Sequence, residues 1–220
     1  MQRLSMPKVI VSGLSVSIDG FAAGPQQSLH DPLGIRGLEL HEWFFENKQN
    51  PAMTGATAIS AQVDERVAQR AMDGFGSFVL GRNMFGPNRG EWGDDSWKGW
   101  WGDDPPWRAP TFILTHFPRP PIEMEGGTTF YFVTTGIFEA LERAKKAAGA
   151  KNVKIGGGVS TVRQYVKAGL VDELQLSISP TFLGQGESLF PGLDFPALGF
   201  SIVERAIGAH AMHITLSKNC

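Results

Sequence analysis

The chain of 220 residues is long enough for one ordinary domain, and a core of that size needs no disulfides or metals to stabilise it. A formal net charge of -2 at pH 7, with 42% hydrophobic and 19% charged residues, is typical of a soluble globular protein and gives no reason to expect nucleic acid or an anionic membrane as partner. The single cysteine, Cys220, excludes an intramolecular disulfide, and no apolar run approaches the roughly 18 residues of a membrane span. The polar N-terminus lacks a signal-peptide pattern, so we expect a cytoplasmic protein.

The first part of the chain is predicted to contain two strands and two helices. Residues 8–17 are rich in valine and isoleucine and end at the turn pair Asp19-Gly20, which predicts a strand. Apolar side chains at helical spacing predict a short helix over 38–47 and a longer one over 59–72. Residues 78–82 then read as a buried strand with Gly81 near its C-terminal end.

Residues 86–110 hold four prolines and five of the six tryptophans, which predicts a long, structured loop. Aromatic side chains among prolines usually form a satellite hydrophobic cluster that holds such a loop in place. The alternative is an aromatic wall on which a flat ring stacks. The tryptophans are Trp92, Trp97, Trp100, Trp101 and Trp107.

The second half of the chain alternates between strands and helices. The strands are expected at 111–115, 129–133, 153–155 and 170–179, the helices at 136–148 and 159–168, and a terminal hairpin at 200–207 and 212–217. This order predicts an α/β fold in a single domain over residues 1–220, with a mostly parallel sheet that an antiparallel C-terminal pair completes.

A triple glycine, Gly156-Gly157-Gly158, joins the strand at 153–155 to the following helix. Backbone amides without side chains, next to the positive end of a helix dipole, can hold a diphosphate. The alternative is a tight connection with no ligand. The spacing is neither that of the dinucleotide fingerprint of doubly wound folds nor that of the P-loop.

Ligands of such a sheet bind beyond the C-terminal ends of its strands, where several unusual residues are expected to lie. Arg82 follows a strand-ending glycine, and a guanidinium there can grip a phosphate through two hydrogen bonds. Asp19 is either a functional carboxylate or a residue that only forms its turn. The five histidines show no spacing typical of metal ligands, so no metal is expected.

Taken together, these segments resemble the dihydrofolate reductase-like family related to the C-terminal reductase domain of the bifunctional riboflavin biosynthesis deaminase-reductase. The resemblance covers nearly the whole chain in the right order. It is carried by residues 17–24, 79–86, 97–101, 115–119, 155–158, 168–174, 183–186 and 189–190.

The resemblance implies a single-domain reductase fold with helices on both faces of the sheet, which binds NADPH and forms a homodimer. It implies that the loop over residues 19–24 covers the nicotinamide and the substrate, with Ser17 and Phe21 on the substrate side and Asp19 as the candidate catalytic carboxylate. The implied contacts of the cofactor diphosphate are Gly156, Gly157, Gly158, Ser160 and Thr161. Those of the adenosine and its 2′-phosphate are Gly81, Arg82, Asn83, Thr115 and His116.

The chain departs from the folate reductases at the first helix, where those enzymes place a carboxylate that protonates the pterin. Glu39, Glu42 and Glu46 offer no clean match, so dihydrofolate is not the expected substrate. Riboflavin-pathway relatives use basic residues for a substrate phosphate, and Lys8, Arg36 and Arg89 lie in no recognisable motif.

We therefore expect an NADPH-dependent reductase of a small heterocyclic substrate, whether a pterin, a flavin-like ring or a pyrimidine sugar. The alternative is a non-catalytic nucleotide-binding or ligand-binding protein that retained the reductase fold.

Overall fold

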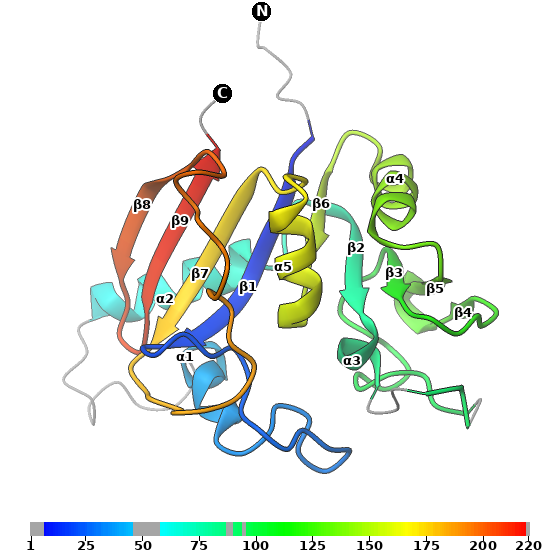
Figure 1. The fold of residues 1–220 in the computed structure, drawn as a ribbon, viewed down its shortest axis with the longest axis horizontal. Helices are drawn as coiled ribbons and strands as arrows, with labels where there is room; N and C mark the ends of the chain where they lie inside the picture. The colour runs from blue at the N-terminus through cyan, green and yellow to red at the C-terminus, as the bar shows by residue number, and fades with distance from the viewer. Residues whose placement is uncertain (1–6, 46–57, 87–89, 94–95, 219–220) are drawn as a thin grey trace, which may run out of the picture. The chain divides into compact units, whose positions relative to one another are not determined.

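The computed structural model describes residues 7–45, 58–86, 90–93 and 96–218 (Figure 1). Nine strands form one sheet in the order β4-β5-β3-β2-β6-β1-β7-β9-β8. The expected mostly parallel sheet with an antiparallel C-terminal pair is confirmed.

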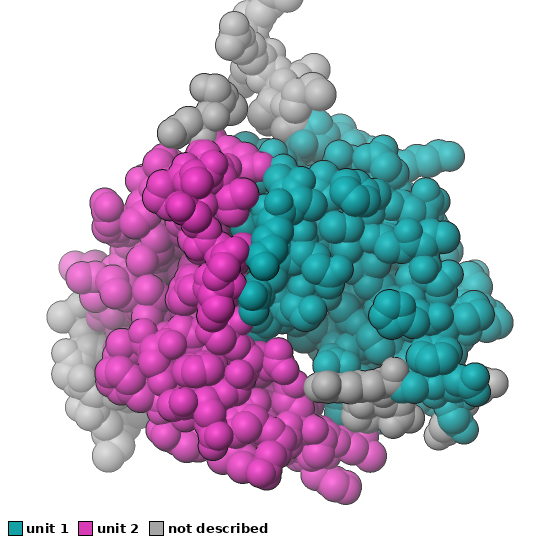
Figure 2. All heavy atoms as spheres, in the orientation of Figure 1, with its two compact units in different colours: residues 1–11, 74–172 teal, residues 12–73, 173–220 magenta. Residues whose placement is uncertain are grey.

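Contacts divide the chain into two compact units, coloured separately in Figure 2. Unit 1 comprises residues 1–11 and 74–172, and unit 2 comprises residues 12–73 and 173–220. That the whole chain acts as a single domain stays a prediction.

Unit 1 contains the parallel part of the sheet. β1 (Val9–Ser17) pairs with β6 (Asn152–Ile155), β6 with β2 (Phe75–Gly81), β2 with β3 (Pro110–Leu114) and β3 with β5 (Thr129–Val133), each in parallel. A two-residue strand that the sequence did not indicate, β4 (Ile122–Glu123), pairs antiparallel with β5. The strands are short and mostly apolar, as buried parallel strands are.

The described part of unit 1 also contains three helices and a 3-10 turn, η4 (Glu125–Gly127). α4 (Ile137–Ala148) packs on β2 and β3 through Ala140, Leu141 and Ala144, and the backbone of Gly149 at φ 60° ends it. α5 (Val159–Lys167) follows the triple glycine as expected. The one-turn helix α3 (Arg82–Phe85) was not predicted, because four residues are too few to show a helical period.

The tryptophan-rich loop belongs to the core of unit 1. Trp92, Trp97, Trp101 and Trp107 pack against a buried cluster of Leu80, Phe85, Ile113 and Phe130. The indole of Trp97 donates to the carbonyl oxygen of Phe85 at 2.9 Å. This packing agrees with the satellite-cluster interpretation of the loop.

Unit 2 contains the antiparallel part of the sheet. β7 (Glu173–Ser179) pairs with β9 (Met212–Lys218), and β9 pairs with β8 (Phe200–Ile207). α2 (Ala58–Arg70) matches the longer predicted helix, and it packs on β8. The helix predicted over 38–47 is instead a 3-10 turn, η1 (Gly37–His41), followed by one helical turn, α1 (Glu42–Phe45). Residues 46 and 47 lie outside the described residues.

A buried polar chain fastens α2 to β7 and β9 in unit 2. Asp64 of α2 is fully buried, and its Oδ1 lies 2.7 Å from Nε2 of His213, whose Nδ1 is hydrogen-bonded to Ser177 Oγ at 2.9 Å. The other carboxylate oxygen of Asp64 accepts from the backbone nitrogen of His210 at 2.9 Å. Gly208 is required nearby, because a Cβ there would collide with the Asp64 carboxylate. Every polar atom of the carboxylate is therefore used.

Within the described residues, no helix combines the length and the apolar character needed to cross a bilayer.

We expect Asp64→Ala to lower the free energy of unfolding by about 3 kcal/mol, because it leaves the buried imidazole of His213 and the half-buried amide of His210 without their acceptor. Urea denaturation measures this difference. Glu65→Ala, at the exposed neighbouring position of the same helix, is the control and should change stability by less than about 0.5 kcal/mol. Equal losses in the two variants would contradict the role given to Asp64.

Candidate functional site

In unit 1, the C-terminal ends of β2 and β6 meet in a backbone contact built from glycine. The amide of Gly81 donates to the carbonyl oxygen of Gly157 at 2.6 Å, and the amide of Gly156 donates to Val79 at 2.9 Å. A Cβ at Gly81 would collide with Oγ1 of Thr161, so a larger residue there would force the Thr161 side chain or α5 to shift. The two glycine segments that the sequence singled out therefore lie together, and each fixes the position of the other.

The triple glycine leaves open space at the start of α5. Gly157 has φ 112°, which side-chain-bearing residues rarely adopt, and its peptide bond to Gly158 is cis. Gly158 is the N-cap of α5 and provides no side chain to cap the first amides of the helix. A Cβ built on Gly158 meets no atom within 4 Å. Ser160 is exposed in the first turn, whereas Thr161 is buried against Gly81.

Arg82, the first residue of α3, is held against an aromatic ring next to this junction. Its guanidinium carbon lies 3.0 Å from the ring centroid of Trp92. Two of its nitrogens make only long hydrogen bonds, of 3.4 Å each, to Thr115 Oγ1 and to the carbonyl oxygen of Gly90. Its Nε is buried and has no hydrogen-bond partner among the described residues.

A second cation, Arg119, approaches the same ring from the segment after β3. Its guanidinium carbon lies 4.8 Å from the Trp92 centroid. Burial, with repulsion from Arg119 as the smaller cause, lowers the pKa of Arg82 to about 10, so Arg82 keeps its charge at neutral pH. Two positive charges on one aromatic ring make this part of unit 1 suited to an anion.

The other residues predicted to contact the adenosine differ in whether their side chains already form hydrogen bonds within the protein. Thr115 Oγ1 donates to the carbonyl of Phe117 at 3.3 Å and accepts from the amide of the same residue at 3.2 Å. His116 and Asn83 are exposed. The sequence interpretation missed Arg119 and the stacking role of Trp92, although Arg119 lies only three residues beyond the Thr115-His116 pair.

In unit 2, Asp19 is hydrogen-bonded to a loop that lies far away in the sequence, at residues 183 and 184. Its two carboxylate oxygens accept from the backbone amides of Leu183, at 3.2 Å, and Gly184, at 2.7 Å. A hydrogen bond to Ser17 is the largest cause that lowers the pKa of Asp19 below its usual value, and the two amides lower it further. Asp19 therefore stays ionised at neutral pH and is better suited to accept hydrogen bonds than to donate a proton. Its catalytic role stays a prediction.

Ser17 and Phe21 form the turn that carries Asp19. The buried hydroxyl of Ser17 accepts from the amide of Phe21 at 2.9 Å, and the amide of Ser17 donates to the carbonyl of Phe21 at 2.8 Å. Phe21 also forms an isolated β-bridge with Ser188. Ser17 thus shapes the loop, while the side chain of Phe21 stays half-buried.

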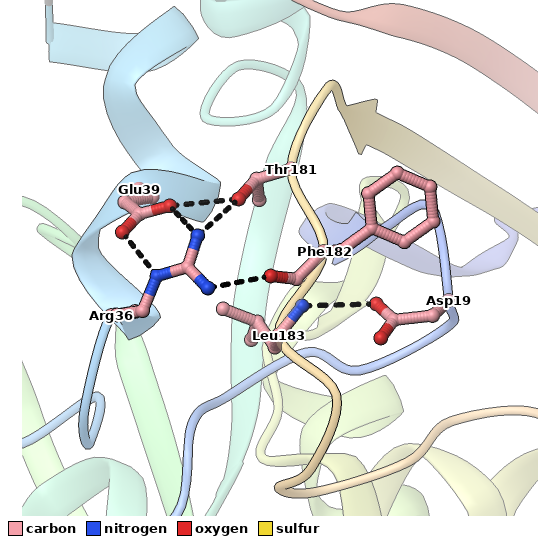
Figure 3. Close-up of polar contacts among 6 residues, drawn as sticks. All are labelled: Asp19, Arg36, Glu39, Thr181, Phe182 and Leu183. Carbon is pink, nitrogen blue, oxygen red and sulfur yellow. Dashed lines mark hydrogen bonds and ion pairs between the residues drawn. The ribbon is translucent and has the colours of Figure 1, made fainter.

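Figure 3 shows a second set of contacts to the same distant loop. Arg36 donates to both carboxylate oxygens of Glu39, at 2.8 and 2.9 Å, and Thr181 Oγ1 donates to Glu39 Oε2 at 2.7 Å. Arg36, followed by Thr181, lowers the pKa of Glu39. Arg36 is thus held in an internal ion pair, and Glu39 stays ionised. The other two candidates from the sequence, Glu46 and Arg89, lie outside the described residues.

Residues 7–210 match the family model described as the RibD C-terminal domain. The chain belongs to the RibD C-terminal domain family. The resemblance inferred from the motifs is confirmed.

Solved structures similar to this RibD-type domain share its fold. A protein from Shewanella sp. PV-4 assigned to riboflavin biosynthesis matches with a TM-score of 0.56 and 17% identity, over 98% of this chain and 100% of its own. Dihydrofolate reductase from Enterococcus faecalis, in complex with NADP(H) and RAB-propyl, matches with a TM-score of 0.50 and 16% identity, over 98% of this chain and 97% of its own. At these identities the likeness shows the fold alone.

Two further relatives are covered only in part. The diaminohydroxyphosphoribosylaminopyrimidine deaminase/5-amino-6-(5-phosphoribosylamino)uracil reductase of Thermotoga maritima matches with a TM-score of 0.53 and 12% identity, over 97% of this chain and 57% of its own. The uncharacterized protein YyaP of Bacillus subtilis (strain 168) is 41% identical over 59 residues, which are 27% of this chain and 31% of that relative.

The described residues contain no group of three or more histidine, cysteine, aspartate or glutamate side chains placed to hold a metal ion.

The two glycines at the start of α5 should respond differently to the same substitution. Gly157→Ala should lower the free energy of unfolding by about 1–3 kcal/mol, because the backbone at φ 112° disfavours any side chain. Gly158→Ala should change stability by less than about 0.5 kcal/mol, because the added Cβ meets open space. Thermal or urea unfolding of both variants measures the effect. Equal destabilisation would contradict the open space next to Gly158.

Proposed function

We propose that this RibD-type domain is an NADPH-dependent reductase of a small heterocyclic substrate. The observation that carries the proposal is Arg82, a half-buried cation whose buried Nε has no hydrogen-bond partner among the described residues, held next to the glycine junction where the strands β2 and β6 end. An anion beside a helix N-terminus and an arginine gains both charge-assisted hydrogen bonds and the helix dipole.

The residues of unit 1 fit the charged groups of NADPH. The open space at Gly158 and the uncapped start of α5 suit the diphosphate, which Gly156, Gly157, Ser160 and Thr161 would border. The Arg82 guanidinium suits the 2′-phosphate, which has no counterpart in NADH. Gly81, Asn83, Thr115 and His116 would flank the adenosine.

NADPH, when bound, supplies a hydride, so the chain needs only to hold and align the two reactants, exclude water and let a proton reach the product. Neither Asp19 nor Glu39 is prepared to donate that proton, because both have lowered pKa values. We assign Asp19 to holding the substrate-side loop, together with Ser17 and Phe21, and an ordered water to the proton transfer.

The lowered pKa values of Asp19 and Glu39 favour a second candidate function, a nucleotide-binding protein that has lost catalysis. A catalytic acid needs a pKa near neutral, and Asp19 and Glu39 move in the opposite direction. NADPH consumption at 340 nm against pterins, flavins and pyrimidine sugars decides between the two. Turnover with any of them supports the reductase, whereas NADPH binding without turnover across the panel supports the second candidate.

We also propose that the protein forms a homodimer through the exposed strand β8, the last strand of the sheet. Ile202, Val203 and Ile207 are 42%, 60% and 76% exposed, and an exposed apolar edge strand tends to be covered by a partner. Light scattering should give twice the chain mass of 23.9 kDa. Ile207→Lys should shift the mass towards the monomer, whereas Phe138→Lys, at another exposed apolar position, on α4, should not. A monomer at micromolar concentration would refute this proposal.

Arg82→Ala should weaken NADPH binding by roughly tenfold to a hundredfold and leave NADH binding nearly unchanged, because a charge-assisted contact to the 2′-phosphate contributes about 1.5–3 kcal/mol. Gly158→Val should weaken both cofactors, since both carry the diphosphate. Arg143→Ala is the matched control, because its guanidinium also lies over aromatic rings, those of Phe112 and Tyr131, but on α4. Calorimetric titration measures each affinity. Equal losses of NADPH and NADH in Arg82→Ala would count against the assignment of the 2′-phosphate.

A further inference from the structure

Phe182 is an exposed aromatic residue in a segment that is otherwise fixed. Its side chain is 60% exposed, while the next residue, Leu183, is buried. Figure 3 shows the ring pointing away from the Arg36 and Glu39 pair. An aromatic ring on an ordered segment can offer a flat face for stacking, and it loses little conformational entropy on binding.

The backbone around Phe182 is held at successive positions from residue 181 to residue 184. The carbonyl of Thr181 accepts from the amide of Ile18 at 2.9 Å, and the carbonyl of Phe182 accepts from Arg36 Nη1 at 2.9 Å. The next two amides donate to the carboxylate of Asp19. These anchors come from residues about 145 to 165 positions away in the chain, so the loop is fixed by tertiary contacts rather than by its own turn.

Arg36 has the left-handed backbone conformation, with φ 61°, which is uncommon for a residue with a long side chain. That conformation coincides with hydrogen bonds from its guanidinium to Glu39 and to the carbonyl of Phe182. A strained backbone that persists because the surroundings fix it is a feature of functional sites. Here the left-handed conformation of Arg36 accompanies the hydrogen bonds that hold the segment of Phe182.

The charges of these loops disfavour an anionic ligand. Arg36 is the only lysine or arginine in residues 18–45 and 180–199, and Glu39 already neutralises it. The same two stretches contain six carboxylates, among them Asp19 and Glu39, whose lowered pKa values keep them ionised. A phosphate bound here would find repulsion and no free cation within these loops.

We propose that Phe182 is a fixed stacking platform for a flat, uncharged heterocyclic ring, and that Asp19 and Arg36 are the residues that position it. The inference rests on the proposed reductase function and narrows its substrate class to a ring without a phosphate. It also adds Phe182 to the residues of unit 2 that are proposed to bind the substrate.

Riboflavin and riboflavin 5′-phosphate test the proposal directly, because they share one flat ring and differ by a phosphate. Titration of the full chain, followed by quenching of flavin fluorescence, should show tighter binding of riboflavin than of its phosphate. Phe182→Ala should weaken riboflavin binding by about tenfold, since stacking of a flat ring on an aromatic side chain is worth about that factor. Phe182→Trp should retain the affinity, and Phe138→Ala, which removes an equally exposed phenylalanine from α4, should not change it.

The positioning role is tested with Arg36→Lys. A lysine keeps the charge but cannot hold Glu39 and the carbonyl of Phe182 together, so riboflavin binding should weaken while NADPH binding stays unchanged. Loss of both affinities, or of neither, would contradict a positioning role.

The stacking role of Phe182 is contradicted if the wild type does not bind riboflavin, or if it binds riboflavin 5′-phosphate more tightly. It is also contradicted if Phe182→Ala binds riboflavin with unchanged affinity, whether or not that variant loses a dimer. Riboflavin binding that depends on Phe182, combined with no NADPH consumption, would instead refute the reductase function and leave the platform in place.

Discussion

The close approach of β2 and β6 is the constraint on which the proposed cofactor site of unit 1 depends. The hydrogen bond from Gly81 to Gly157 brings two strand ends so near that Thr161 fills the space where a side chain of residue 81 would lie. That contact sets where α5 begins and where α3 begins, and therefore where Arg82 leaves the sheet. A helix N-terminus and an arginine are thus fixed by the backbone of the sheet itself, and neither depends on a flexible loop.

The two units differ in the charge of their candidate binding residues. In unit 1, the guanidinium groups of Arg82 and Arg119 both lie over the ring of Trp92, and repulsion from Arg119 contributes to the lowered pKa of Arg82. In unit 2, the loops that carry Asp19 and Glu39 are acidic, and their only arginine is paired. A phosphate-rich cofactor suits the first environment and an uncharged ring suits the second. Within unit 2, the buried Asp64 to His213 contact serves stability, since it fastens α2 to the sheet.

The fold was largely predictable from the sequence because its main signals are local. The run of 153–155 into three glycines and a helical period predicts β6, its turn and α5 without any tertiary knowledge, and the alternation of strands and helices predicts a parallel sheet. The helix turn α3 and the two-residue strand β4 are too short to show a period. The contacts of Asp19 and Arg36 join residues about 145 to 165 positions apart, and no local pattern indicates such pairings. Asp19 shows the limit most clearly, because one Asp-Gly turn serves equally a catalytic loop and a structural anchor.

Energy transfer from tryptophan to bound dihydronicotinamide tests the central claim most directly, since Trp92 contacts Arg82 in the proposed cofactor site. The wild-type chain, excited at the indole band, should lose tryptophan emission and gain nicotinamide emission as NADPH is added, and the effect should saturate. NADH should produce the same change only at much higher concentration, because it lacks the 2′-phosphate that Arg82 would hold. No transfer with either nucleotide, or equal titration curves for the two, would contradict the account.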